Sequence, residues 1–372
     1  MSDEVVFHLW PTSSGHRLAQ ITLNKPTHLN ALSLRMVDAM QNHLNAWAQD
    51  PDIVAVLLDG AGSRAFCAGG DVVSLYRSIQ STPPGQIPDL AAQFFEREYR
   101  LDYTIHTYPK PMVCCAHGYV MGGGVGLLVG ASHRIVTADV KLAMPEISIG
   151  LYPDVGGSWW LGRLPLRIGA FLAITGATLN ASDALWAGLA DYVLPAEART
   201  GLIEMLQQIP WSGEPPQDKR ILSRQLQQLT TSTARPPSHL QHHGERIADI
   251  IGDDLWPDRA HRLAALAADT DPWLVEAGRQ FMAGSPTSAV LSLEMQQRCR
   301  RLSLADSLRL EWQASVGCCI HHDFPEGVRA LLIDKDRQPR WHPTRIDEVT
   351  PQWIEAHLST TIAQPHPLAD LT

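Results

Sequence analysis

The sequence predicts an α/β core followed by a mostly helical C-terminal region, and three observations support this. The first half of the chain alternates short apolar runs with helical patterns, glycine-rich turns follow two of the runs, and the part beyond residue 218 is dominated by helical spacing. Residues 5–10 and 17–24 read as paired strands, and residues 53–60 as a buried strand ending at a glycine. Such repeated strand–strand–helix units predict right-handed crossovers between the strands.

The remaining elements follow in chain order. Ser33 is expected to cap a helix with apolar positions at helical spacing. Residues 111–120 read as another buried strand, followed by a glycine turn and a helix from about Gly124; 133–139 and 141–146 read as short strands. Proline-rich stretches at 80–90 and 209–218 predict loops, and the second marks a boundary between a core, 1–200, and a helical region, 201–372. Ser285 and Pro286 predict the start of a helix that runs to about Arg300.

Composition excludes several classes of protein. The 372 residues carry a net charge of -9 without a basic stripe, which argues against nucleic-acid binding. None of the six cysteines forms a C-x-x-C pair, so we expect reduced, buried thiols, a cytoplasmic location and no metal site. The N-terminal sequence shows no signal-peptide pattern. The apolar run 111–131 contains many glycines, so a buried strand, turn and helix explain it better than a membrane span.

Two glycine-rich turns are the first candidates for chemistry: AFCAGGDV at 65–72 and MGGGVG at 121–126. Glycines let backbone N–H groups approach a ligand closely, and two such groups aimed at one point can hold a developing oxyanion. The alternatives are a tight turn that only reverses the chain and close packing of a helix on a strand. The pattern is not G-x-G-x-x-G, so a dinucleotide site is poorly supported.

Two carboxylates, Glu146 and Asp154, lie in the apolar run MPEISIGLYPDVGG at 144–157. A buried acid is costly unless it is paired or neutral, and a raised pKa suits a general acid or base; a carboxylate can also supply a nucleophile. The structural alternatives are a buried ion pair for Glu146 and a turn or helix cap for Asp154.

Other polar residues are weaker candidates. By spacing alone Glu98 reads as a solvated helix residue, and His117 and His133 read as structural groups beside buried strands. No Gly-x-Ser-x-Gly motif or Ser-His-Asp set is found.

At these residues the chain resembles the crotonase (enoyl-coenzyme A hydratase/isomerase) superfamily. The resemblance rests on LNKPTHLNALS (23–33), on AFCAGGDV and on the GGGVG and PEISIG segments. FFEREY (94–99), PDVGG and HDFPEGVRA make the chain more similar to the 3-hydroxyisobutyryl-coenzyme A hydrolase branch. The resemblance covers nearly the whole chain and is poorest at 200–280.

The resemblance implies a crotonase spiral of ββα units, with a helical C-terminal region packed on it. It implies that the N–H groups of Gly70 and Gly123 form an oxyanion hole, that Glu146 and Asp154 are the catalytic acids, and that Glu98 contacts the substrate. Gly123, Glu146 and Asp154 would also bind the substrate. The acyl-coenzyme A is then the substrate itself, no cofactor is required, and a homo-oligomer is possible.

One departure distinguishes the branches. Hydratases of the superfamily carry a second glutamate where this chain has Gly126, and usually a glycine where it has Asp154. The resemblance therefore favours hydrolysis of a short 3-hydroxyacyl-coenzyme A, as in valine breakdown. An enoyl-coenzyme A hydratase or isomerase is the alternative, and an acyl-coenzyme A-binding scaffold without activity is a third.

Overall fold

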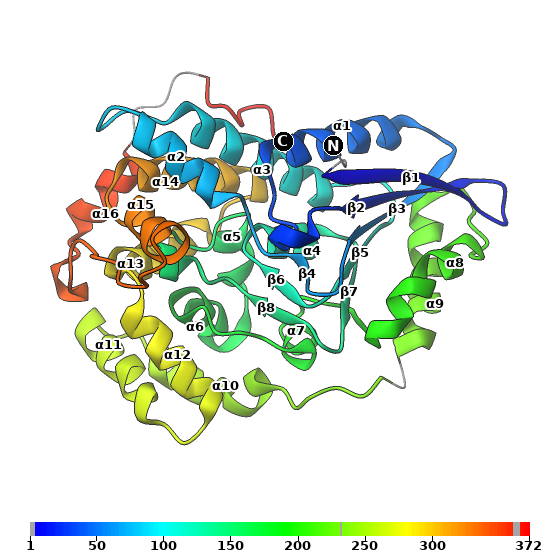
Figure 1. Ribbon diagram of the computed structural model, residues 1–372. Coiled ribbons are helices and arrows are strands. Elements are labelled where there is room, and N and C mark those ends of the chain that lie inside the picture. Colours follow the sequence, from blue (N-terminus) through cyan, green and yellow to red (C-terminus); the bar gives the residue numbers. More distant parts are fainter. Residues whose placement is uncertain (1–3, 231–232, 360–364) are drawn as a thin grey trace. The chain divides into compact units, whose positions relative to one another are not determined.

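The computed structural model describes residues 4–230, 233–359 and 365–372 (Figure 1). The chain forms two compact units, each assembled from separate stretches of sequence. The first unit contains the described residues of Met1–Gly70, Leu101–Leu142 and Leu179–Gln241. The second contains those of Asp71–Arg100, Ala143–Thr178 and His242–Thr372.

The first unit is built on a six-stranded sheet of order β1-β2-β3-β5-β7-β9. Its strands are β1 (Val5–Pro11), β2 (Arg17–Leu23), β3 (Ile53–Gly60), β5 (Met112–Ala116), β7 (His133–Thr137) and β9 (Tyr192–Leu194). β1 and β2 pair antiparallel, and the other neighbours pair parallel. A smaller sheet of order β4-β6-β8 joins β4 (Ala65–Cys67), β6 (Tyr119–Met121) and β8 (Lys141–Ala143). The predicted strands at 5–10, 17–24 and 53–60 are confirmed.

The prediction of a single strand over 111–120 is wrong, because the chain bends at Gly118 and enters the second sheet. Gly118 has a φ of +55°, and a Cβ there would lie 2.2 Å from the carbonyl oxygen of Arg64. Only glycine fits such a left-handed position so close to another backbone. The bend therefore divides the apolar run into β5 and β6.

The helices of the first unit cover the sheet and close its core. They are α1 (Leu34–Gln49), α4 (Gly123–Gly130), α7 (Ala181–Trp186), α8 (Leu202–Gln207) and α9 (Pro215–Thr230). Ser33 caps α1 as predicted, because its side chain accepts a hydrogen bond from the N–H of Met36. Apolar side chains of β3, β5 and β7 pack with those of α8 and α9 in one buried cluster. Continuous burial of this kind is typical of parallel strands covered by helices.

The second unit is almost entirely helical. Two of its helices, α3 and α10, also include residues that belong to the first unit. Its helices are α2 (Val72–Ser81), α3 (Asp89–His106), α5 (Gly157–Leu161), α6 (Ile168–Thr175), α10 (His239–Ile251), α11 (Trp256–Ala265), α12 (Pro272–Ala283), α13 (Pro286–Cys299), α14 (Leu304–Ile320), α15 (Asp323–Val328) and α16 (Pro351–Leu358). α13 packs against α5 and α6, and α14 packs against α16. The cap at Ser285 is confirmed, since its side chain accepts from the N–H of Ser288.

The observed fold agrees with the predicted class, an α/β core with many C-terminal helices. The division after residue 200 stays a prediction, since compactness does not test which segments fold on their own. Within the described ranges, no helix combines the length and the apolar character that crossing a membrane requires.

Candidate active site

The two glycine-rich turns lie against each other within the first unit. A Cβ at Gly69 would be 3.4 Å from the carbonyl oxygen of Met121 and 3.9 Å from the nitrogen of Gly123. A Cβ at Gly124 would be 2.4 Å from the carbonyl oxygen of Cys67. The turns therefore approach backbone to backbone, which larger residues at these positions would prevent.

The N–H groups of Gly70 and Gly123 belong to this pair of turns. Gly123 is the first residue of α4, where N–H groups have no partner inside the helix. No backbone hydrogen bond between described residues outside the regular elements has either of these N–H groups as its donor. The structure thus leaves both groups available, and their action as an oxyanion hole stays a prediction.

Three buried carboxyl groups form a cluster in the second unit. Glu146 opens a short 3₁₀ turn, Glu146–Ile149, and is 6% exposed. Asp154 lies in the turn before α5, and Glu98 lies on α3; they are 5% and 3% exposed. The interpretation of Glu98 as a solvated helix residue is wrong, because its side chain points into this cluster. The residue spacing along α3 could not show that the helix face carrying Glu98 is also covered by other parts of the protein.

Burial and mutual repulsion favour the protonated forms of these carboxyls. Burial raises the pKa of Asp154 to about 6. Burial, and then the charge of Asp154, raise the pKa of Glu146 and of Glu98 well above the ordinary range. Among the described residues no arginine, lysine or histidine forms an ion pair with any of the three. The ion-pair alternative for Glu146 therefore finds no support.

Two oxygen atoms of this cluster are buried without a hydrogen-bond partner in the described part of the chain: Oε1 of Glu98 and Oε2 of Glu146. Such groups are rare in folded proteins, since each costs about 1–3 kcal/mol. Unpaired acceptors beside groups of raised pKa are typical of a site that awaits a polar ligand.

The turn that carries Asp154 is strained. Val155 has a φ of +51° and Gly156 a φ of +81°. A β-branched residue in this region is an outlier that costs on the order of 1–3 kcal/mol, so surrounding contacts must hold it. The carboxylate of Glu311, on α14, accepts hydrogen bonds from the N–H groups of Gly156 at 2.7 Å and Ser158 at 2.9 Å. Glu311 thereby fixes the turn, a role that no local pattern in the sequence indicated.

A set of buried hydroxyl groups stands behind Asp154, and sequence reasoning missed all of them. The hydroxyl of Tyr99 lies 2.6 Å from Oδ2 of Asp154 and 2.6 Å from the hydroxyl of Ser315. Tyr152 lies 2.9 Å from Ser315 and donates to the backbone carbonyl of Glu311 at 2.7 Å. Tyr99 directly follows Glu98, and Tyr152 lies two residues before Asp154. This closeness in sequence to the candidate acids was the one feature that could have pointed to the two tyrosines.

The raised pKa values predict that the protein is less stable at high pH. Between about pH 4 and 6 the folded protein holds a proton on Asp154 that the unfolded chain has lost. This contribution is complete below the unfolded pKa and is lost as the pH rises through the folded pKa; Glu98 and Glu146 act in the same direction. We expect a lower urea midpoint at about pH 8 than at about pH 5, with a smaller difference in Asp154→Asn. A midpoint that rises with pH would contradict this.

His117 and His133 are structural groups, as their surroundings show. His117 hydrogen-bonds the carbonyl of Gly62 at 3.0 Å and the guanidinium of Arg199 at 2.9 Å. His133 contacts the hydroxyl of Ser223 at 3.0 Å. Neither ring belongs to the carboxyl cluster. In the described ranges, no group of three His, Cys, Asp or Glu side chains could hold a metal ion.

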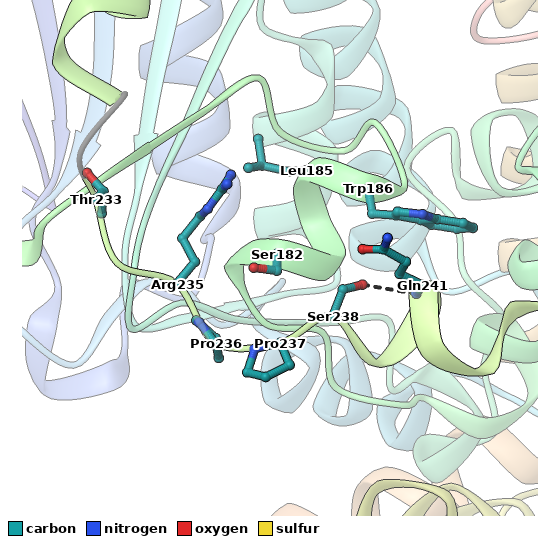
Figure 2. Close-up of a pocket in the computed structure, with 9 residues that line it drawn as sticks. All are labelled: Ser182, Leu185, Trp186, Thr233, Arg235, Pro236, Pro237, Ser238 and Gln241. Atoms are coloured by element: carbon teal, nitrogen blue, oxygen red, sulfur yellow. Dashed lines mark hydrogen bonds between the residues drawn. The ribbon is translucent and has the colours of Figure 1, made fainter.

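A surface pocket of about 560 Å³ lies in the first unit, where α7 meets the segment before α10 (Figure 2). It is lined by Ser182, Leu185, Trp186, Thr233, Arg235, Pro236, Pro237, Ser238 and Gln241. The hydroxyl of Ser238 accepts from the N–H of Gln241 in Figure 2, which is a local helix cap. The lining contains no acid, histidine or cysteine, so this pocket is not a centre for acid–base chemistry.

The glycine turns and the buried acids define a class of protein. A family model described as enoyl-CoA hydratase/isomerase matches residues 18–358, and the chain belongs to this family. The curated 3-hydroxyisobutyryl-CoA hydrolase, mitochondrial, of Gallus gallus is 37% identical over 338 residues, which cover 90% of this chain and 84% of that protein. Its counterpart from Homo sapiens is 35% identical over 342 residues, with 91% and 86% covered.

Solved structures of the same fold carry other names. A carnitinyl-CoA dehydratase from Mycobacterium thermoresistibile has a TM-score of 0.83 and 34% identity, covering 98% of both chains. An enoyl-CoA hydratase from Rhodobacter sphaeroides has a TM-score of 0.82 and 32% identity, covering 97% of this chain and all of that one. The crotonase fold is thus confirmed, while the names of similar proteins divide between thioester hydrolysis and hydration or dehydration.

Proposed function

We propose that this protein hydrolyses the thioester of a short 3-hydroxyacyl-coenzyme A, with 3-hydroxyisobutyryl-coenzyme A as the preferred substrate. The observation that carries the proposal is the buried pair Glu146 and Asp154, of which Asp154 is held by Tyr99 at 2.6 Å. The names of the curated relatives support the substrate. The reaction gives 3-hydroxyisobutyrate and free coenzyme A, and we place it in valine breakdown.

The N–H groups of Gly70 and Gly123 bind the thioester oxygen in this mechanism, and preorganised donors stabilise the charge that develops there. Glu146 either attacks the carbonyl carbon to form an anhydride or takes a proton from the attacking water. Asp154 orients the substrate hydroxyl or gives a proton to the leaving thiolate sulfur. Glu98 contacts the substrate through the oxygen that lacks a partner.

Hydration of an enoyl-coenzyme A is the second candidate, and two similar proteins of known structure, a carnitinyl-CoA dehydratase and an enoyl-CoA hydratase, favour it. Syn addition of water across a C=C bond uses two carboxyls that position and activate one water. This chain has Gly126 where hydratases of the superfamily carry the second glutamate. Its buried acids instead include Asp154, which supports the hydrolase.

Two substrates run side by side distinguish the candidates. A thiol-reactive dye follows the release of coenzyme A from 3-hydroxyisobutyryl-coenzyme A, and the loss of enoyl absorbance follows hydration of crotonyl-coenzyme A. We expect rapid thiol release and no loss of enoyl absorbance. Hydration without thiol release would assign the protein to the hydratases, and binding without either reaction would indicate a scaffold.

The proposal includes no cofactor, because coenzyme A enters as part of the substrate. We also propose a cytoplasmic location, for which six buried cysteine thiols are the supporting observation. Cell fractionation with an antibody against the protein tests the location. A homo-oligomer is proposed from the resemblance alone, and light scattering of the purified protein tests it.

A further inference from the structure

A chain of hydroxyl groups connects Asp154 to the backbone of α14. It runs from Oδ2 of Asp154 to Tyr99 at 2.6 Å, and from Tyr99 to Ser315 at 2.6 Å. It continues from Ser315 to Tyr152 at 2.9 Å and ends at the carbonyl oxygen of Glu311 at 2.7 Å. The three hydroxyl residues are fully buried, each 0% exposed, so bulk solvent does not reach these contacts.

The number of protons in this chain depends on the state of Asp154. Each of the three hydroxyls donates one hydrogen, while the carbonyl of Glu311 only accepts. With Asp154 ionised, Tyr99 donates to Asp154 and Tyr152 donates to the carbonyl. Ser315 then has one hydrogen for its two contacts, with Tyr99 and with Tyr152. The two oxygen atoms of the other contact therefore lie close together without a hydrogen between them.

With Asp154 protonated on Oδ2, all four contacts are satisfied. Asp154 donates to Tyr99, Tyr99 to Ser315, and Ser315 to Tyr152, whose hydrogen already points to the carbonyl. Four donors then serve four contacts in one direction. A buried row of hydroxyl groups in which every contact contains a hydrogen is more stable than one in which two oxygen atoms face each other without a hydrogen, because buried lone pairs cannot accept a hydrogen bond from solvent instead.

Burial of Asp154 acts in the same direction, whereas the hydrogen bond that Tyr99 donates to the ionised carboxylate lowers the pKa of Asp154. The groups that face it from α3, from the 3₁₀ turn, from its own turn and from α14 are Glu98, Tyr99, Glu146, Tyr152, Glu311 and Cys318. None of them is a cation. Burial raises the pKa of Tyr99 and of Tyr152, so both phenols keep their hydrogens.

We propose that Ser315 and Tyr152, acting through the hydroxyl of Tyr99, stabilise the protonated form of Asp154, so that this residue begins the reaction as a proton holder. Tyr99, Ser315 and Tyr152 are positioning residues in this scheme. This proposal rests on the proposed function only where it assigns the proton of Asp154 a role in the reaction. The chain itself is a property of the second unit and can be tested without substrate.

Two variants should lower the pH midpoint at which Asp154 titrates, and a third should raise it. Ser315→Ala removes both serine contacts and leaves Tyr99 free to donate to an ionised Asp154, so the midpoint for Asp154 falls by about one pH unit. Tyr152→Phe lets Ser315 donate to Tyr99, and it lowers the midpoint in the same way. Tyr99→Phe removes the donor to the carboxylate and raises the midpoint.

The measurement is a pH titration of the Asp154 carboxyl C=O stretch by infrared difference spectroscopy, assigned through its absence in Asp154→Asn. Ser292→Ala is the matched control, because Ser292 is also buried on a helix of this unit, and within the described ranges its hydroxyl bonds only the carbonyl of Ser288, at 2.7 Å. Its midpoint should equal that of the unchanged protein. The pH profile of kcat/KM is recorded in parallel, and its alkaline limb should move with the infrared midpoint, because a group that must be protonated limits activity at high pH.

An unchanged or raised midpoint in Ser315→Ala overturns the proposal, because a simple relay that stabilised the carboxylate would raise it and a space-filling serine would leave it unchanged. Absence of thiol release from the unchanged protein overturns the proposed function instead. In that case the infrared midpoints still decide the question of the hydroxyl chain.

Discussion

Glu146→Gln is expected to reduce thiol release from 3-hydroxyisobutyryl-coenzyme A by at least about 10³-fold. The amide has the shape of the carboxyl, yet it can neither attack a carbonyl carbon nor take a proton from water. Both routes open to Glu146 therefore stop. Steady-state kinetics give kcat, and binding of the unreacted substrate by calorimetry shows whether affinity is kept.

The same substitution should not destabilise the fold. Glu146 is 6% exposed, and its Oε2 lacks a partner among the described residues. A neutral amide avoids the cost of a buried charge, so the urea midpoint at neutral pH should be equal or higher. Glu294→Gln, on the surface of α13, is the control and should change neither quantity. Retention of most of the activity in Glu146→Gln would reject the assignment of this residue.

Glu311→Ala is expected to lower the free energy of unfolding by about 2–6 kcal/mol, because each buried N–H donor left without an acceptor costs about 1–3 kcal/mol; this is the second large effect. The side chain is 0% exposed and accepts from two backbone N–H groups, those of Gly156 and Ser158. Alanine leaves both donors buried without an acceptor, at the turn where Val155 has a positive φ. The strained turn then loses its main constraint, and the position of Asp154 becomes less defined.

Urea unfolding compares this variant with Glu294→Ala, which removes a half-exposed glutamate whose partner is Arg298 at 2.7 Å. A surface pair of this kind contributes well under about 1 kcal/mol. Glu311→Gln keeps one acceptor oxygen and should fall between the two. Equal midpoints for the two alanine variants would show that Glu311 does not hold the turn.

Local signals in the sequence located most elements. Ser33 and Ser285 mark helix starts because a hydroxyl before an apolar helical pattern satisfies an N–H of the first turn. The run 53–60 has the length and composition of a buried strand, and the structure has β3 at the same residues. The bend at Gly118 was missed because its cause is the backbone of Arg64, more than fifty residues earlier.

The candidate site divides in the same way. Glu146 and Asp154 could be named because an acid in an apolar run is unusual and because the resemblance supports them. Ser315 and Glu311 could not, since they lie about 160 residues further along the chain, on a helix where serine and glutamate are ordinary. Their importance comes from tertiary contacts that no spacing rule describes.

The buried cysteines have a practical consequence for the dye assay. All six thiols are buried, and burial raises the pKa of Cys115 and of Cys299 to about 12. Thiols that are protonated and inaccessible react slowly with disulfide reagents, since the thiolate is the attacking species. The folded enzyme should therefore give almost no blank signal, and the colour should report released coenzyme A alone. A dye signal that rises without substrate would then indicate that the enzyme unfolds during the measurement and exposes its thiols.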